Sequence, residues 1–407
     1  MQKEIIVYSD HVIYWCIILI PFSAAIAPAP ISVFMGLLIA SFLLKKALKR
    51  ERIIPKTPVN MPLFLFIAVT CLSLVNTVNF TDSLKGGILR LMLYVFLFFA
   101  TADSLKDETH LRRIMLSITA GLLLVSVDGI WQVVTGYSFI RRDYPPVINL
   151  GLVRATSSFK DSNTLGIYLS AFAPVLFGLT LYHFKGAKRV VFALFSLIVL
   201  AGTALTYSRP TLLAVYLSVF FLAAVKKSKA LIVFLLALGL LSPFILPKSV
   251  KEWAKAVEYN PIRFMCNDDR IAVYLTSLNM IKAHPVIGVG AGAFMKSYKE
   301  FKEFPEYRNV VTLDEMKAHN IYLHMAGEIG LAGFGAFVWL LYRLFAKSRS
   351  IYGKFKEGYC REVSLLLIIC LIAFLVNGLT ESSLYYSRVG LIFWYLAGIM
   401  SGLERLA

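Results

Sequence analysis

The sequence is poor in charged residues, which make up only 16% of its 407 positions. A soluble domain carries about 25%, so the composition argues against one. Apolar residues reach 58% and the mean hydropathy is +0.70. Continuous apolar runs long enough to cross a bilayer, roughly 20 residues each, recur along the chain. Because lipid leaves backbone groups unsatisfied outside helices and closed barrels, and these runs do not alternate, we expect an all-α polytopic membrane protein.

Acidic residues are also few, with 24 Asp and Glu against 42 Lys and Arg and a net charge of +18. Such an excess can indicate nucleic-acid binding. Most of it, however, lies in short connections between apolar runs, at 45–56, 185–189, 226–229 and 343–362. Basic short loops are typical of the cytoplasmic side of a membrane protein. The charge therefore predicts topology in a lipid bilayer, and no nucleic-acid partner.

Cysteine is scarce, with five residues in the chain. Only Cys266 falls in a long predicted exported loop, so we expect no intramolecular disulfide framework there. The N-terminal region lacks a recognisable signal-peptide cleavage site, so the first span is expected to serve as the signal.

The apolar runs predict about twelve transmembrane helices with both termini in the cytoplasm. Their expected bounds are 12–27, 30–47, 61–77, 87–102, 112–134, 163–183, 188–206, 210–225, 229–246, 320–345, 363–380 and 389–404. This divides the chain into spans one to nine (1–246), a large periplasmic loop (247–318) and the last three spans (319–407). Apolar periodicity in 249–258 and 270–285 predicts that the loop is partly helical and lies against the outer membrane surface.

Basic residues are expected on the cytoplasmic side, so basic residues at outer helix ends need a different explanation. Arg209 stands directly before Pro210, at the start of a helix whose positive end faces outward, which favours an anion site. The alternative is an interfacial arginine that reaches lipid headgroups. Arg270 begins the predicted loop helix, where a salt bridge to Asp268 or Asp269 is the alternative.

Two further groups of polar residues lie near outer helix ends. Arg154 and Lys160 precede the sixth span, with Asn163 at its start. They predict either an anion patch or solvated loop charges. Glu381 and Arg388 lie between the last two spans, where the two side chains can pair with each other.

The segment KAHNIYLHMAGEIGLAGF (317–334) combines a membrane helix with polar chemistry. His319 is expected at the N-terminal end of the tenth span, where the helix dipole favours the neutral ring and the imidazole can accept a proton. Asn320 can orient that ring or a hydroxyl substrate. A capping or interfacial histidine is the alternative. His324 and Glu328 can share a helix face, but two ligands are too few for zinc, and neither a metal nor another cofactor is predicted.

Glycines recur in two neighbouring segments, 288–294 and 327–333. Gly327, Gly330 and Gly333 repeat every third position, which favours close packing of another helix. GVGAGAF (288–294) is only superficially similar to a dinucleotide loop, because it lacks the strand and helix that such binding needs.

Several segments together resemble one family. IKAHPVIGVGAGAF (281–294) resembles a signature hPxxGxGxxxF, and AHNIYLHMAGEIGLAGF (318–334) resembles HNxxLxxxxExGxxG. Both signatures belong to the O-antigen ligase and polymerase superfamily. The order of an outer arginine, a long exported loop with a leading arginine, and then the histidine also fits. The resemblance extends from about Arg154 onward.

The resemblance implies a GT-C-like glycosyltransferase of the bacterial inner membrane with a periplasmic active site. Its donor would be a glycan on undecaprenyl pyrophosphate. A ligase would use a sugar hydroxyl of the lipid A core as acceptor, and a polymerase another lipid-linked glycan. By motif, His319 matches the essential histidine as general base, and Arg209 and Arg270 match the arginines of the pyrophosphate site, with Arg154 as a further candidate.

Other candidate site residues are Asn320, Lys160, Asn163, Glu328, Glu381 and Arg388. A pyrophosphate leaving group needs charge stabilisation, which arginines supply. We therefore expect a metal-independent, inverting transfer. The competing hypotheses are a secondary transporter, for which Asp128 is the nearest acid within a span, and a non-catalytic scaffold.

Overall fold

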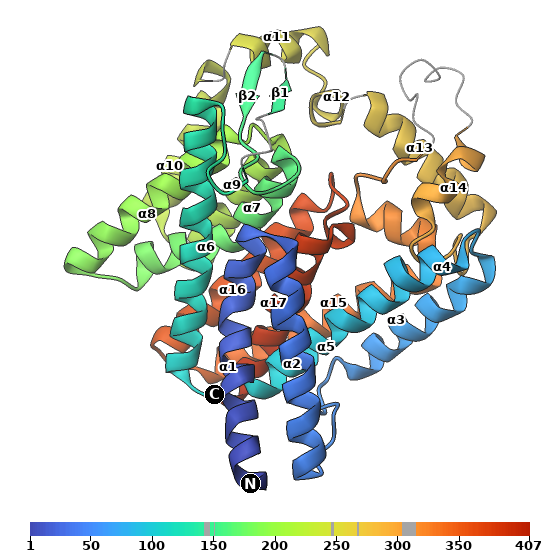
Figure 1. The fold of residues 1–407 in the computed structure, drawn as a ribbon. Helices are drawn as coiled ribbons and strands as arrows, with labels where there is room; N and C mark the ends of the chain where they lie inside the picture. The colour runs from blue at the N-terminus through green and yellow to red at the C-terminus, as the bar shows by residue number, and fades with distance from the viewer. Residues whose placement is uncertain (142–146, 150, 246–247, 267, 303–314) are drawn as a thin grey trace.

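Among the residues that the structure describes, twelve long helices or helical runs lie at the positions of the predicted spans. Figure 1 shows their arrangement. The computed structural model describes residues 1–141, 147–149, 151–245, 248–266, 268–302 and 315–407. The helices are α1 (Gln2–Ile26), α2 (Pro28–Lys49), α3 (Asn60–Leu72) with η1 (Ser73–Asn76), the run α4 (Phe80–Asp82), η2 (Ser83–Leu89) and α5 (Arg90–Ser104), α6 (Glu108–Thr135), α7 (Ser162–Tyr182), α8 (Gly186–Leu205), α9 (Arg209–Val225), α10 (Lys229–Ile245), α15 (Ile321–Lys354), α16 (Tyr359–Asn377) and α17 (Ser387–Gly402).

Eight of these helical segments in the described residues are long and apolar enough to cross a membrane. They are α1, α2, the run from α4 to α5, α6, α7, α8, α15 and α16. Three shorter apolar helices are formed by α3 with η1, by α9 and by α10. The expected all-α membrane protein is therefore confirmed, while the count of twelve spans stays a prediction.

The long segment between α10 and α15 contains the helices that its periodicity predicts. They are α11 (Lys248–Ala256), α12 (Pro261–Met265), α13 (Asp268–Ala283) and α14 (Phe294–Phe301). Figure 1 shows α11 and α12 at the end of the molecule opposite both chain termini. Residues 247, 267 and 303–314 of the predicted loop lie outside the described residues. A short antiparallel hairpin at the same end, β1 (Val147–Asn149) and β2 (Leu152–Arg154), was not predicted.

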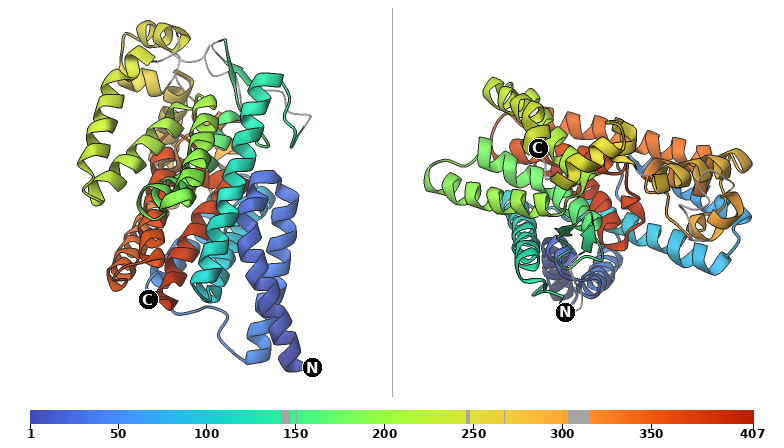
Figure 2. Two further views of the ribbon diagram at one scale, coloured as in Figure 1. Left: turned by 90° about the vertical axis from the view of Figure 1, so that its left-hand side faces the viewer. Right: turned by 90° about the horizontal axis from the view of Figure 1, so that it is seen from above.

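The central helices α7, α9 and α16 pack closely at their outer ends, and α7 is the most buried of the long spans. Asn377 at the end of α16 donates to Ser170 Oγ of α7 at 3.0 Å. A side chain at Gly166 would place its Cβ 2.1 Å from Thr211 Oγ1 of α9. This packing brings the start of α9 and the segment after α16 to the same end of the bundle. The left view of Figure 2 shows both chain termini at the end opposite the yellow helix α11.

Helix α6 holds the segment that follows the hairpin. Gln132 accepts the backbone N–H groups of Thr156 (2.8 Å) and Ser157 (2.9 Å). Asp128, fully buried, accepts the Ser157 hydroxyl at 2.6 Å and the Phe139 N–H at 2.7 Å. Buried polar groups on a span are thus used to fix the outer loop, and this acid has a structural role.

Candidate active site

Glu381, in the segment between α16 and α17, is the centre of the site and is only 1% exposed. Its Oε1 accepts hydrogen bonds from Arg270 Nη2 (2.5 Å) and Asn163 Nδ2 (2.8 Å). Its Oε2 lies 3.2 Å from His319 Nδ1 and accepts the Tyr386 hydroxyl at 3.4 Å. Burial raises the pKa of Glu381, but the bond with His319 and the charge of Arg270 outweigh it and lower the pKa overall. Glu381 is therefore an ionised carboxylate shared by His319 and Arg270.

This carboxylate fixes the orientation of the His319 ring. Because an ionised carboxylate only accepts hydrogen bonds, His319 Nδ1 carries a proton, and in the neutral ring Nε2 is then the nitrogen with the lone pair. The backbone of His319 has a φ of +49°, a left-handed conformation that costs about 1–3 kcal/mol and is common at functional sites. Its carbonyl accepts the Tyr274 hydroxyl at 3.2 Å. The ring is 27% exposed, so this fixed imidazole remains accessible.

Arginines gather on the Arg270 side of Glu381. Arg154 donates to Asn163 Oδ1 at 2.9 Å and to the Thr206 carbonyl at 2.8 Å. Arg209 donates to the Phe264 carbonyl, and its guanidinium lies 5.2 Å from the Phe264 ring centre. Burial lowers the pKa of Arg154; nearby acids oppose this, and the positive charge of Arg270 adds to it. Three guanidinium groups thus surround the outer end of α9, where they can bind an anion with several oxygens.

Two of these residues have partners that the sequence did not predict. Arg270 forms its ion pair with Glu381, which lies far along the sequence. Arg388 donates to the Ala24 carbonyl at 2.8 Å and the Ser158 carbonyl at 2.6 Å, so it caps the C-terminal end of α1. The alternative pairing of Glu381 with Arg388 is therefore replaced by the pairing of Glu381 with Arg270 and His319.

Asn320 is the N-cap of α15. Its Oδ1 accepts the N–H groups of Tyr322 (2.9 Å) and Leu323 (3.0 Å), and its Nδ2 donates to the Leu379 carbonyl at 2.9 Å. Such caps satisfy the free N–H groups of a first helical turn. Asn320 therefore anchors the backbone next to His319, in place of the expected contact with the ring or a hydroxyl.

His324 and Glu328 form a buried pair on α15. His324 Nε2 lies 3.2 Å from Glu328 Oε1, and His324 Nδ1 lies 3.1 Å from Ser382 Oγ. Glu328 also accepts the Phe294 N–H at the start of α14 at 3.2 Å. The pair joins α14 and α15 to the residue after Glu381, which makes Glu328 a supporting residue of the site.

Helix α15 is interrupted at Gly330, where φ is +68°. The loop 285–290 enters this interruption. Backbone hydrogen bonds cross it from Val289 to Gly327 (2.9 Å), from Gly290 to Glu328 (2.9 Å) and from Leu331 to Pro285 (2.8 Å). A Cβ at Gly330 would lie 2.1 Å from the Val286 carbonyl oxygen. The predicted helix partner at this glycine is wrong: a loop occupies the place, and the two family-like motifs form one docked unit.

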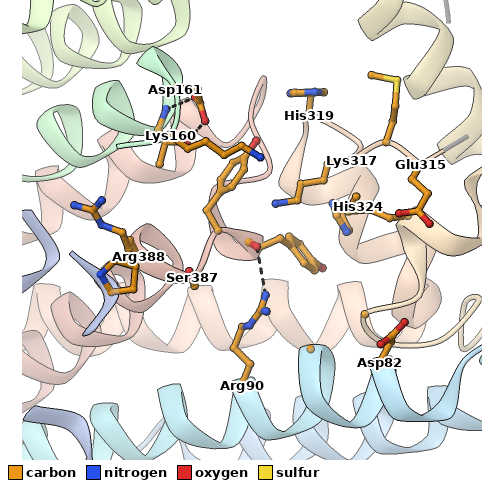
Figure 3. Close-up of a pocket in the computed structure, with 18 of the residues that line it drawn as sticks. Asp82, Arg90, Lys160, Asp161, Glu315, Lys317, His319, His324, Ser387 and Arg388 are labelled. Carbon is orange, nitrogen blue, oxygen red and sulfur yellow. Dashed lines mark hydrogen bonds between the residues drawn. The ribbon is translucent and has the colours of Figure 1, made fainter. Parts of the chain in front are cut away.

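A cavity of about 950 Å³ opens beside His319 (Figure 3). Side chains from the start of α5, from 159–161, from 315–319 and from 385–388 line it. Lys160, exposed, borders it next to Asp161, the observed N-cap of α7, whose side chain accepts the Thr164 N–H at 2.8 Å. The cavity size lies within the range of small-molecule sites.

The sequence did not reveal four residues of this region: Tyr274, Tyr386, Lys317 and Arg90. Burial raises the pKa of both Tyr274 and Tyr386, which keeps their hydroxyls as donors to His319 and Glu381. Their positions beside motif residues are the available signal: Lys317 precedes His319 by two residues. The pairing of Glu381 with His319 joins residues 62 positions apart, and no local spacing rule predicts it.

Comparison with known protein families is consistent with these motifs. Residues 194–338 match the family model described as O-antigen ligase. The matched segment includes Arg209, Arg270, His319 and Glu328, whereas Glu381 lies outside it. No curated protein matches the chain. Residues 194–338, which contain both motifs, are therefore similar to the O-antigen ligase family.

Proposed function

We propose that this protein transfers a glycan from an undecaprenyl-pyrophosphate donor to a sugar hydroxyl of the lipid A core. The observation that carries the proposal is Glu381, which bonds the candidate base His319 through one oxygen and the candidate anion ligand Arg270 through the other. A base and a cationic site are thereby held at a fixed separation, as a displacement reaction between a hydroxyl and a diphosphate ester requires.

In the proposed reaction, His319 Nε2 takes the proton of the acceptor hydroxyl as its oxygen attacks the anomeric carbon. The bond between that carbon and the diphosphate oxygen breaks, and the electron pair leaves on the diphosphate. Arg209 and Arg270, with Arg154 beside them, stabilise this charge. Glu381 stabilises the imidazolium that forms. Attack opposite the leaving group inverts the anomeric centre, and none of these steps calls for a metal ion.

The proposed location is the periplasmic face of a bacterial inner membrane, with both termini cytoplasmic. The positive-inside pattern and the position of α11 and α12 opposite the termini support it. The same pattern supports the division into spans 1–246, loop 247–318 and spans 319–407. Asp128 lies in a span but binds loop groups, which weakens the transporter hypothesis; substrate flux into sealed vesicles without glycan transfer would favour it.

The test is complementation of cells that lack the ligase, with lipopolysaccharide separated on a gel. Wild type should restore long-chain bands, and His319→Ala should reduce them, because a general base contributes about 10²–10⁴-fold. His11→Ala, an exposed histidine at the opposite end, is the matched control. Long-chain bands that persist in His319→Ala would remove this residue from the mechanism.

The same assay separates ligase from polymerase. Long glycans attached to the lipid A core indicate ligation, whereas ladders on the polyprenyl carrier without core indicate polymerisation. Full activity of a purified reaction in the presence of a chelator is expected, and loss of activity that added metal restores would contradict the metal-independent mechanism. Unimpaired function of His319→Ala together with Arg209→Ala would indicate a scaffold.

A further inference from the structure

A second group of cationic side chains lines the cavity beside His319. Lys317, Lys160 and Arg90 line the cavity, and Figure 3 shows the Lys160 and Lys317 side chains extending into the same space above Arg90. The three residues come from three separate segments of the chain. Burial lowers the pKa of Lys317, and the positive charges of Arg90 and Lys160 lower it further, while Asp161 and Glu381 oppose them.

The partners of these cations leave two ammonium groups open to a ligand. The Lys317 ammonium lies 4.0 Å from the ring centre of Tyr386. Within the part of the chain that the structure describes, neither Lys317 nor Lys160 forms an ion pair with a carboxylate. By contrast, Lys296 in the same cavity binds Glu315 at 2.7 Å. Like charges held together without a bonded acid repel each other, and a bound anion would relieve that repulsion.

Glu381, the partner of His319, interacts with both cationic groups. Arg270 contacts the Oε1 side of Glu381, whereas Lys317 reaches its Oε2 side through Tyr386. Because the donor diphosphate is proposed to bind at the arginines, the lysine side of the cavity is available to the acceptor. His319 lines the cavity on that side, so a molecule in the cavity can present a hydroxyl to it.

We propose that Lys317, Lys160 and Arg90 form an acceptor site that binds an anionic substituent of the phosphate class on the acceptor glycan. The proposal rests on the proposed function, which places the donor diphosphate at the arginines. Ammonium groups bind phosphate as mobile point charges and so tolerate different positions of the substituent on a sugar. The site thus favours anionic acceptors over neutral ones.

The first experiment measures binding, so it does not depend on transfer. Purified protein in neutral detergent is titrated with inorganic phosphate by calorimetry. Wild type is expected to bind at two sites. Lys317→Gln with Arg90→Gln should weaken one by roughly tenfold or more, and Arg209→Gln with Arg270→Gln should weaken the other. Lys296→Gln, in the same cavity but ion-paired, is the matched control and should retain both sites.

Two results would overturn the proposal: a single phosphate site that only the arginine variant removes, or two sites that survive in the lysine variant. Lys160→Gln alone, at an exposed position, gives a second test that does not perturb folding, and unchanged phosphate binding in it removes Lys160 from the site. Thermal unfolding of each variant confirms that the comparison is between folded proteins.

The second experiment uses transfer itself. A phosphorylated acceptor and the same acceptor treated with phosphatase are compared. The KM of wild type should be lower for the phosphorylated form, and Lys317→Gln should remove this preference while the KM for the donor stays unchanged. Equal preference in wild type would refute the acceptor site. Absence of transfer with every acceptor, with both phosphate sites intact, would instead refute the proposed function.

A lipid headgroup also carries a phosphate group that the Lys317 site can bind. Phosphate binding is therefore repeated in nanodiscs of phosphatidylcholine and of phosphatidylglycerol. Equal binding in both supports a glycan-borne anion. Loss of the Lys317-dependent site only in phosphatidylglycerol would identify a membrane lipid as the occupant and overturn the acceptor assignment.

Discussion

At the scale of single residues, Glu381 joins the two halves of the site. It is buried and ionised, and four side chains bond its two oxygens. Removing one partner of a buried charged group costs about 3–5 kcal/mol, because the other charge is left uncompensated. Substitutions at Glu381 should therefore affect both stability and chemistry, and the two effects can be measured separately.

Glu381→Gln should lower kcat by roughly 10²-fold or more, because an amide can present its N–H to His319 and stabilise the wrong tautomer. The measurement is single-turnover glycan transfer at saturating donor. Tyr386→Phe removes only one donor to the same carboxylate and serves as control, with a smaller loss expected. Equal rates for wild type and Glu381→Gln would show that Glu381 does not position the base.

The depressed pKa of Glu381 also predicts how stability depends on pH. A carboxyl whose pKa is lower in the folded state contributes stability above its unfolded pKa, about 4.3 for glutamate. This contribution is lost as the pH falls through the lower, folded value. The difference in free energy of unfolding between wild type and Glu381→Gln should thus shrink as the pH falls below about 4. A difference that grows below this pH, in tryptophan-detected unfolding, would contradict this sign.

At the scale of elements, the interruption of α15 positions the site. Its first part carries His319 at its N-terminal end, and the loop 285–290 supplies backbone partners where the helix breaks. The sequence predicted the helix and its polar start, because apolar length and motif spacing are local properties. It predicted the wrong partner for Gly330, because a glycine at helical spacing is compatible with either a neighbouring helix or a loop. The carboxylate that orients His319 comes from another interhelical segment, which periodicity cannot place.

Gly330→Ala should destabilise the protein by about 1–3 kcal/mol, since its φ is +68° and its new Cβ would meet the Val286 carbonyl. Transfer activity should fall with it, because the docked loop and Glu328 would shift. Gly335→Ala on the same helix is the matched control: no atom lies within 4 Å of its added Cβ, and alanine is the better helix former. A lower unfolding temperature for Gly335→Ala than for Gly330→Ala would contradict a stabilising role for the docking of loop 285–290 at Gly330.

At the scale of the whole molecule, the sequence predicted most of the helices because lipid imposes length and hydrophobicity on every span. Helix ends agree within a few residues in the central bundle, for example 163–183 against Ser162–Tyr182. The larger deviations are at α1, which begins at Gln2, and at α15, which continues to Lys354. In both, polar residues remain helical beyond the apolar run. Hydropathy also gives no information about the β1–β2 hairpin, which ends at Arg154.

The proposed topology predicts which exposed positions an impermeant thiol reagent can reach in intact cells. In a Cys71→Ser background, which removes the exposed native thiol, Lys251→Cys in α11 should react from outside. Lys188→Cys at the start of α8 should react only after the membrane is opened. Both positions are exposed in the structure, so accessibility differs only by the side of the membrane. Labelling of Lys188→Cys in sealed cells would reverse the orientation.

In the proposed reaction, the bonds of Glu381 to both Arg270 and His319 imply an order of substrate binding. A diphosphate that engages Arg270 draws that guanidinium away from the carboxylate. The negative charge of Glu381 is then no longer offset by Arg270 and can stabilise positive charge that develops on the His319 ring during transfer. Arrival of the lipid carrier would in this way arm the base, so that an acceptor hydroxyl is activated only when there is a sugar for it to attack.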